Sequence, residues 1–97
     1  MSTAIVIPQV INKEIIPGLR FPDEEVLGSA PAIARRKADL ERALALGNLE
    51  HTKVTLIFED AEAVRQVETT VWGLTDKRVI LKQGALIPIH RVHIVKL

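Results

Sequence analysis

The spacing of the hydrophobic residues changes once along this chain, from a helical period before residue 48 to an alternating period after it. The helical set, spaced i, i+7 and i+11, is Ile33, Leu40 and Leu44, and the first alternating set is Val54, Leu56 and Phe58. Ser29 suits a helix N-cap, Pro31 suits the first turn, and Gly47-Asn48 suits a helix end. The pattern therefore predicts a helix over residues 30–46 and β-strands after it.

Five segments of strand character follow the helix. They cover residues 52–59, 64–74, 78–82, 86–89 and 93–97. The second segment is long for a strand, and Gly73 near its end favours a bend. A helix followed by five short antiparallel strands is the order of SH3-like and Sm-like barrels. The predicted fold is mainly β (α+β): a small five-stranded antiparallel barrel with one N-terminal helix and an extended N-terminal arm.

The apolar side chains of these segments define a predicted core. It comprises Ile33, Leu40, Leu44, Val54, Leu56, Phe58, Val67, Val71, Val79, Leu81, Leu86, Val92 and Val95.

Residues 1–28 form the predicted arm, and residues 29–97 form the helix-and-barrel domain. The arm begins with the apolar, largely β-branched run Ala4–Ile7, which Pro8 ends. The arm is richer in Ile and Val side chains than a solvated tail usually is. We therefore expect it to dock on its own domain or on a neighbouring subunit. The N-terminus has no basic region and no long apolar stretch, which favours a cytoplasmic protein over a secreted one.

Composition excludes several classes of protein. At 97 residues and 47% hydrophobic content, the chain is long and apolar enough for one folded domain rather than a disordered segment. It has no cysteine, which excludes disulfide scaffolds and thiol nucleophiles, and no apolar run is long enough to span a membrane. No phosphate-binding glycine loop occurs, so neither enzyme activity nor a cofactor is predicted. The basic run Arg35-Arg36-Lys37 is interpreted as a solvated helix face.

Two resemblances add to this interpretation. Over residues 38–97, four strings resemble a group of short uncharacterised bacterial proteins, which carries no activity to transfer: LGNLEH (46–51), VETTVW (67–72), TDKRVILKQG (75–84) and IPIHRV (87–92). The last string is also similar to the segment that joins strands four and five in Sm-like barrels. The Sm RNA-binding signature is not matched, because Val79 or Ile80 stands where that family has Asn, and Arg91 precedes Val92 rather than Gly. The resemblance implies a fold and a tendency to oligomerise.

The preferred functional hypothesis is a non-enzymatic binding or assembly module. Edge strands offer unpaired backbone groups to a partner, and residues 86–89 are short, apolar and uncharged. We expect self-association through an edge that contains Leu86, Ile87 and Ile89. On this hypothesis a charge at Ile87 disrupts the multimer, and an unchanged mass for a folded Ile87→Asp protein would contradict it.

Two alternatives remain open from the sequence. The first is an RNA- or DNA-binding barrel whose contact residues are Lys53, Arg65, Trp72, Arg78, Lys82, His90 and Arg91. Trp72 would then stack on bases, although it also suits a core position, and the net charge of +1 is small for a nucleic-acid binder. The second alternative is a metal-dependent enzyme built around His51, His90 and His93, with Glu50 or Glu68 as a further ligand. No membrane or small-molecule partner is predicted.

Overall fold

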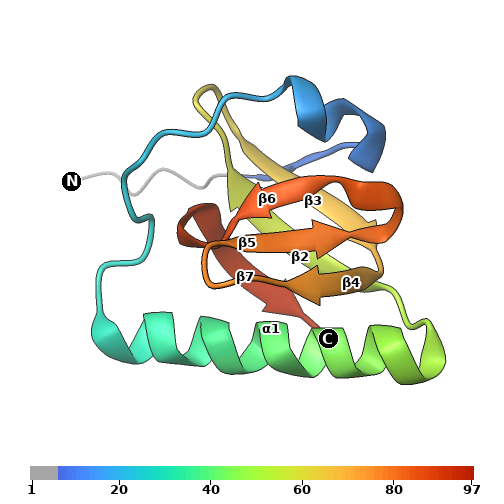
Figure 1. Cartoon of the computed structure of the whole chain (residues 1–97). Coiled ribbons are helices and arrows are strands. Elements are labelled where there is room, and N and C mark those ends of the chain that lie inside the picture. The colour runs from blue at the N-terminus through green and yellow to red at the C-terminus, as the bar shows by residue number, and fades with distance from the viewer. Residues whose placement is uncertain (1–6) are drawn as a thin grey trace.

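The computed structural model describes residues 7–97, in which one long helix, α1 (Ala30–Glu50), and two β-sheets form an α+β domain (Figure 1). Helix α1 lies along one side of two sheets, and the segment that precedes it crosses their other side. The elements in chain order are β1 (Gln9–Val10), the 3-10 helix η1 (Lys13–Gly18), α1 (Ala30–Glu50), β2 (Val54–Glu59), β3 (Val64–Thr69), β4 (Val71–Leu74), β5 (Arg78–Leu81), η2 (Lys82–Gly84), β6 (Leu86–Pro88), η3 (Ile89–Arg91) and β7 (Val92–Lys96).

The strands form two sheets. The first has the order β1-β3-β2-β7, and the second has the order β4-β5-β6. All neighbouring pairs are antiparallel except β1 and β3, which run parallel, with Gln9 opposite Arg65. In the second sheet β6 lies at one edge, with Ile87 opposite Val79 and Leu86 opposite Ile80.

The predicted five-stranded barrel is wrong. Residues 7–97 contain seven strands in two sheets, and the sheets do not close into a barrel. The long segment predicted over 64–74 divides at Thr70, so that β3 pairs with β2 while β4 pairs with β5. The Thr70 carbonyl accepts a hydrogen bond from Lys82 N–H at 2.9 Å, and its hydroxyl donates to His51 O at 3.4 Å. A further strand, β1, comes from the predicted arm, where the short apolar segments show no clear alternation.

Helix α1 begins where the sequence predicts and ends later. The hydroxyl of Ser29 accepts a hydrogen bond from Ala32 N–H, which confirms the predicted N-cap. The predicted end at residue 46 is wrong, because the helix continues through Gly47 to Glu50 and ends at His51, which has a left-handed backbone with φ of 55°. At Gly47 an added Cβ would lie 2.3 Å from Val71 O. Glycine at this position therefore lets the helix approach β4 closely and does not end the helix.

The core is a single buried cluster to which α1, η1 and strands of both sheets contribute side chains. Eleven of the thirteen predicted core residues are buried or pack against the buried cluster, whereas Ile33 and Leu86 are exposed. The core also contains residues that were not predicted, namely Ile16, Ala43, Ile57 and Ile87. Ile16 comes from η1, so the N-terminal segment completes the core of its own domain; residues 1–6, with most of the Ala4–Ile7 run, lie outside the described part of the chain. No helix within residues 7–97 is both long and apolar enough to cross a bilayer.

Candidate interaction surface

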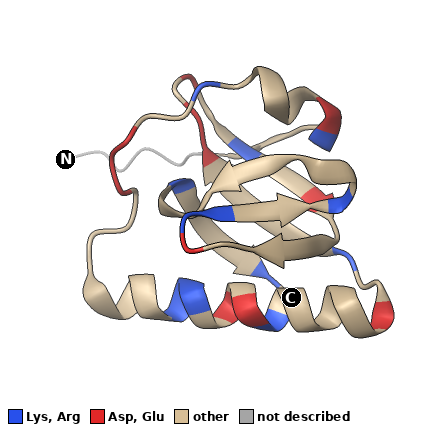
Figure 2. Ribbon diagram, in the orientation of Figure 1, with Lys and Arg blue, Asp and Glu red and all other residues tan. Residues whose placement is uncertain are grey.

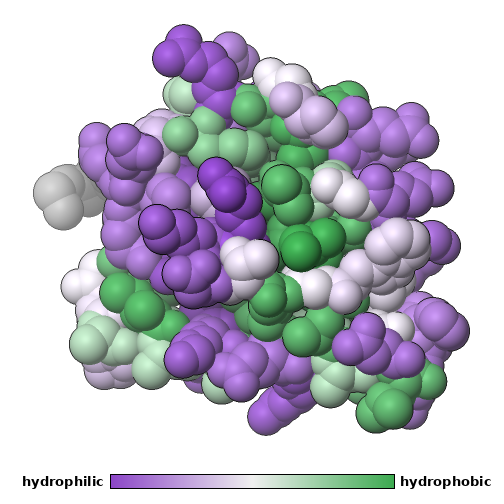
Figure 3. Space-filling model, in the orientation of Figure 1, coloured by the Kyte–Doolittle hydropathy of each residue, from purple (hydrophilic) through white to green (hydrophobic). Residues whose placement is uncertain are grey.

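One side of the β4-β5-β6 sheet faces away from the core and carries the apolar side chains of Trp72, Ile80 and Leu86. We call the surface formed by these three side chains the outer face. They come from three neighbouring strands and alternate with buried residues that point to the core. Trp72 is 50% exposed and Leu86 is 45% exposed. Figure 3 shows the hydrophobic region over this sheet, bordered by hydrophilic side chains. Ile80, which lies between Trp72 and Leu86, is partly buried. A contiguous apolar patch on a sheet can serve as a binding surface.

A β-bulge shapes this face. Val71 pairs with Leu81 and Gly73 pairs with Ile80, so Trp72 is the additional residue on β4. A Cβ at Gly73 would lie 3.2 Å from the Ile80 side chain. Glycine thus leaves room for Ile80 beside the exposed indole of Trp72.

The outer edge of β6 has free backbone hydrogen-bonding groups. Leu81 N–H donates to Ala85 O, and Ile89 N–H donates to Lys77 O, so the odd-numbered residues of this segment face β5. The N–H and C=O of Leu86 and the C=O of Pro88 consequently point away from β5. Within residues 7–97, β6 pairs with β5 alone. This edge can accept one more extended strand.

An open hollow of about 940 Å³ lies beside this edge, and we call it the β6 hollow. One wall is β6 with its flanking residues, and the opposite wall is the segment from η1 to residue 23. The apolar lining includes Ile16, Leu19, Phe21, Ala85, Leu86 and Ile89. Asp76, Lys77 and Arg78 lie in the same lining, so the hollow is apolar with charges of both signs. Figure 2 shows basic positions near both ends of β5 and mixed charges along α1.

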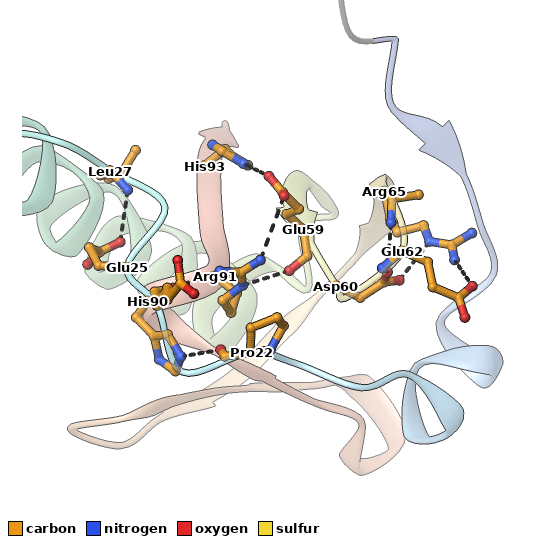
Figure 4. Close-up of polar contacts among 12 residues, drawn as sticks. Pro22, Glu25, Leu27, Glu59, Asp60, Glu62, Arg65, His90, Arg91 and His93 are labelled. Carbon is orange, nitrogen blue, oxygen red and sulfur yellow. Dashed lines mark hydrogen bonds and ion pairs between the residues drawn. The ribbon is translucent and has the colours of Figure 1, made fainter.

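Residues 20–27, which we call the strap, are held in place by hydrogen bonds to η3 and the β2–β3 turn (Figure 4). His90 Nε2 lies 3.0 Å from Pro22 O, which requires the proton on Nε2, and Val26 N–H donates to His90 O at 3.0 Å. Arg91, whose side chain is buried, donates to Glu24 O at 2.7 Å and to Glu59 O at 3.0 Å. The strap therefore forms a fixed wall of the β6 hollow.

Arg36 joins the strap to α1. Its guanidinium binds both carboxylate oxygens of Glu25, at 2.7 and 2.6 Å, and donates to Val92 O at 3.1 Å. The residue is only 6% exposed, so the prediction that Arg35-Arg36-Lys37 forms a solvated face is wrong at its central residue. The Arg36 hydrogen bonds, with a further contribution from Leu27 N–H, outweigh desolvation and lower the pKa of Glu25 to about 2 from its ordinary 4.5.

This ion pair makes stability depend on pH. Because the pKa of Glu25 is lower in the folded chain, its contribution is complete above about pH 4.5 and is lost as the pH falls toward 2. We expect Glu25→Gln to lower the free energy of unfolding by about 1.5 kcal/mol at pH 7, the figure allowing for the partial exposure of the carboxylate. The difference from the original chain should shrink below pH 4.5, as measured by urea unfolding. Glu24→Gln is the control, since its side chain forms no bond within residues 7–97. A difference that stays constant down to pH 2.5 would contradict this assignment.

The structure separates the seven residues proposed for nucleic-acid contact. Lys53, Trp72, Arg78 and Lys82 are exposed. The other three, Arg65, His90 and Arg91, make contacts within the domain. Arg65 pairs with the buried Asp60 at 2.7 Å and also binds Gln9. Burial raises the pKa of Asp60, but the N–H groups of Glu62 and Ala63, together with Arg65, outweigh this and hold it below its ordinary value.

The three histidines lie in separate environments. His51 is the C-cap of α1, His90 binds the strap, and His93 Nε2 lies 2.8 Å from Glu59 Oε1. Over residues 7–97, no group of three His, Asp or Glu side chains is placed to hold a metal ion. The convergence that the metal-enzyme alternative requires is therefore not found.

The three predicted edge residues have different positions. Leu86 is on the outer face and its backbone points to the free edge of β6. Ile87 is 0% exposed and belongs to the core. Ile89 is partly buried and lines the β6 hollow. A partner strand at this edge would thus contact the side chains of Leu86 and Ile89. The side chain of Ile87 would stay in the core and make no contact with the partner.

Comparisons of the chain with protein-family models, curated proteins and solved structures find no match.

Proposed function

We propose that this protein is a non-enzymatic binding module that self-associates through the β4-β5-β6 sheet, using the outer face and the free edge of β6. The observation that carries the proposal is the row of Trp72, Ile80 and Leu86, which runs across the sheet to an edge with unpaired backbone groups. A partner at this surface could therefore both bury the apolar side chains of the outer face and pair with the backbone of β6. Both are common sources of affinity between protein chains.

Charge supports self-association over nucleic-acid binding. The net charge of +1 produces little repulsion between two copies. Five Lys and Arg side chains were candidates for nucleic-acid contact. Two of them, Arg65 and Arg91, instead bind acceptors inside the domain. Trp72 and Lys82 remain exposed, so nucleic acid is the alternative that the same experiment must distinguish.

The proposal is tested by comparing Leu86→Lys with Leu49→Lys in sedimentation equilibrium. Leu86 is on the outer face, whereas Leu49 is 81% exposed near the end of α1, so the two changes add the same charge at different surfaces. Loss of an apolar contact and burial of a charge should raise the dissociation constant at least tenfold, about 1.4 kcal/mol, for Leu86→Lys alone.

Equal effects of the two substitutions would contradict the proposed surface. Excess absorbance at 260 nm in the purified protein, removed by salt, would favour nucleic acid instead.

A further inference from the structure

The chain itself contains a segment whose length and composition fit the free edge of β6. Residues Ala4–Ile7 form a four-residue apolar run that Pro8 ends, and Ile7, the first described residue, is 83% exposed. Four residues of an extended strand span about 13 Å, and the three residues of β6 span about 10 Å. The run is thus long enough to pair along the whole edge.

The chemistry of the run also matches the two sides of that edge. In an extended strand Ile5 and Ile7 point to one side, and Ala4 and Val6 point to the other. A strand added to β6 would have the apolar lining of the β6 hollow on one side and the outer face on the other. A run that is apolar on both sides suits this position, whereas a strand with alternating polar residues would bury polar groups.

The topology favours the run of a second copy over that of the same chain. Ile7 precedes β1, which pairs with β3 in the first sheet, whereas β6 is an edge of the second sheet. We propose that residues 4–7 of one copy add as a strand to β6 of another copy and occupy its β6 hollow. This inference rests on the proposed self-association and names the segment that performs it.

The first experiment compares two double variants of the full chain by sedimentation equilibrium. Ile5→Asp/Ile7→Asp places charges in the run, and Ser2→Asp/Thr3→Asp places the same charges before it. We expect the first variant to raise the dissociation constant at least tenfold and the second to leave it within about twofold. The melting temperature of a dilute sample reports folding, and an unfolded first variant would contradict the expectation that Ile7 lies outside the core.

The second experiment distinguishes exchange between copies from docking within one chain. Ile5→Asp/Ile7→Asp retains an intact β6 edge, and Leu86→Lys retains an intact run. If the run binds a second copy, a mixture of the two variants should associate at least tenfold more tightly than either variant alone. No gain on mixing would overturn the inference.

The outcomes separate this inference from the proposed function. If the original chain self-associates and Leu86→Lys weakens this association while Ile5→Asp/Ile7→Asp does not, the inference fails and the proposed function stands. If the original chain is a monomer at every concentration, the proposed function fails and this inference fails with it.

Discussion

Gly47→Ala is expected to lower the free energy of unfolding by about 2 kcal/mol and the melting temperature by about 10 °C. An added Cβ would lie 2.3 Å from Val71 O and 3.0 Å from Thr70 Cγ2, so α1 and β4 must move apart. Overpacking of this kind costs about 1–3 kcal/mol, and more where backbone must shift. The better helix propensity of alanine, about 1 kcal/mol, offsets only part of this cost. Thermal unfolding followed by circular dichroism measures the change.

Gly28→Ala is the matched control for this prediction. No atom lies within 4 Å of a Cβ added there, so this change should be neutral or stabilise the protein slightly. Equal melting temperatures for the two variants would show that α1 does not approach β4 as closely as described.

Ile87→Asp is expected to unfold the domain, and Leu86→Asp is expected to leave it folded. Ile87 is fully buried and Leu86 is 45% exposed, although they are neighbours on β6. A carboxylate without a partner at a core position costs several kcal/mol, which is comparable to the whole stability of a domain of this size. Leu86→Asp should lower the free energy of unfolding by about 1 kcal/mol or less, because its side chain stays in water.

Circular dichroism and thermal unfolding of both variants measure this difference. The result would also decide whether a charge at Ile87 acts on self-association or on the fold of the subunit. The sequence predicts loss of assembly, whereas the structure predicts loss of the fold. A folded Ile87→Asp chain would contradict the assigned side of β6.

The sequence predicted the elements whose hydrophobic period is long and regular. The N-terminal end of α1 follows from Ser29 and Pro31, and the alternation of Val54, Leu56 and Phe58 correctly places them in the core. The later end of α1 was missed because a glycine can either end a helix or allow another backbone to approach closely. At Gly47 only the contact with β4 distinguishes these two roles. The barrel prediction failed because the break at Thr70 depends on pairing with two different strands, which the sequence does not show.

The candidate surface was predicted only in part. Leu86 and Ile87 lie on β6, which is an edge strand, whereas Ile89 belongs to η3, and self-association through this edge stays a prediction. The side of each residue was assigned wrongly, because an entirely apolar run has no alternation to set which side chains face inward. The strap contacts were not predicted. The pairing of Arg36 with Glu25, for example, depends on how the strap packs against α1, which the local sequence pattern does not show. Trp72 was left between core and surface, and its position at the bulge places it outside.

The most direct test of the proposed function is the mass of the full chain, measured by light scattering across a size-exclusion peak over a wide range of loading concentrations. Self-association predicts a mass that rises from 10.8 kDa toward a defined multiple as the concentration increases, with absorbance at 260 nm no higher than protein alone gives. A mass that stays at 10.8 kDa up to the highest concentration would contradict self-association through the β4-β5-β6 sheet.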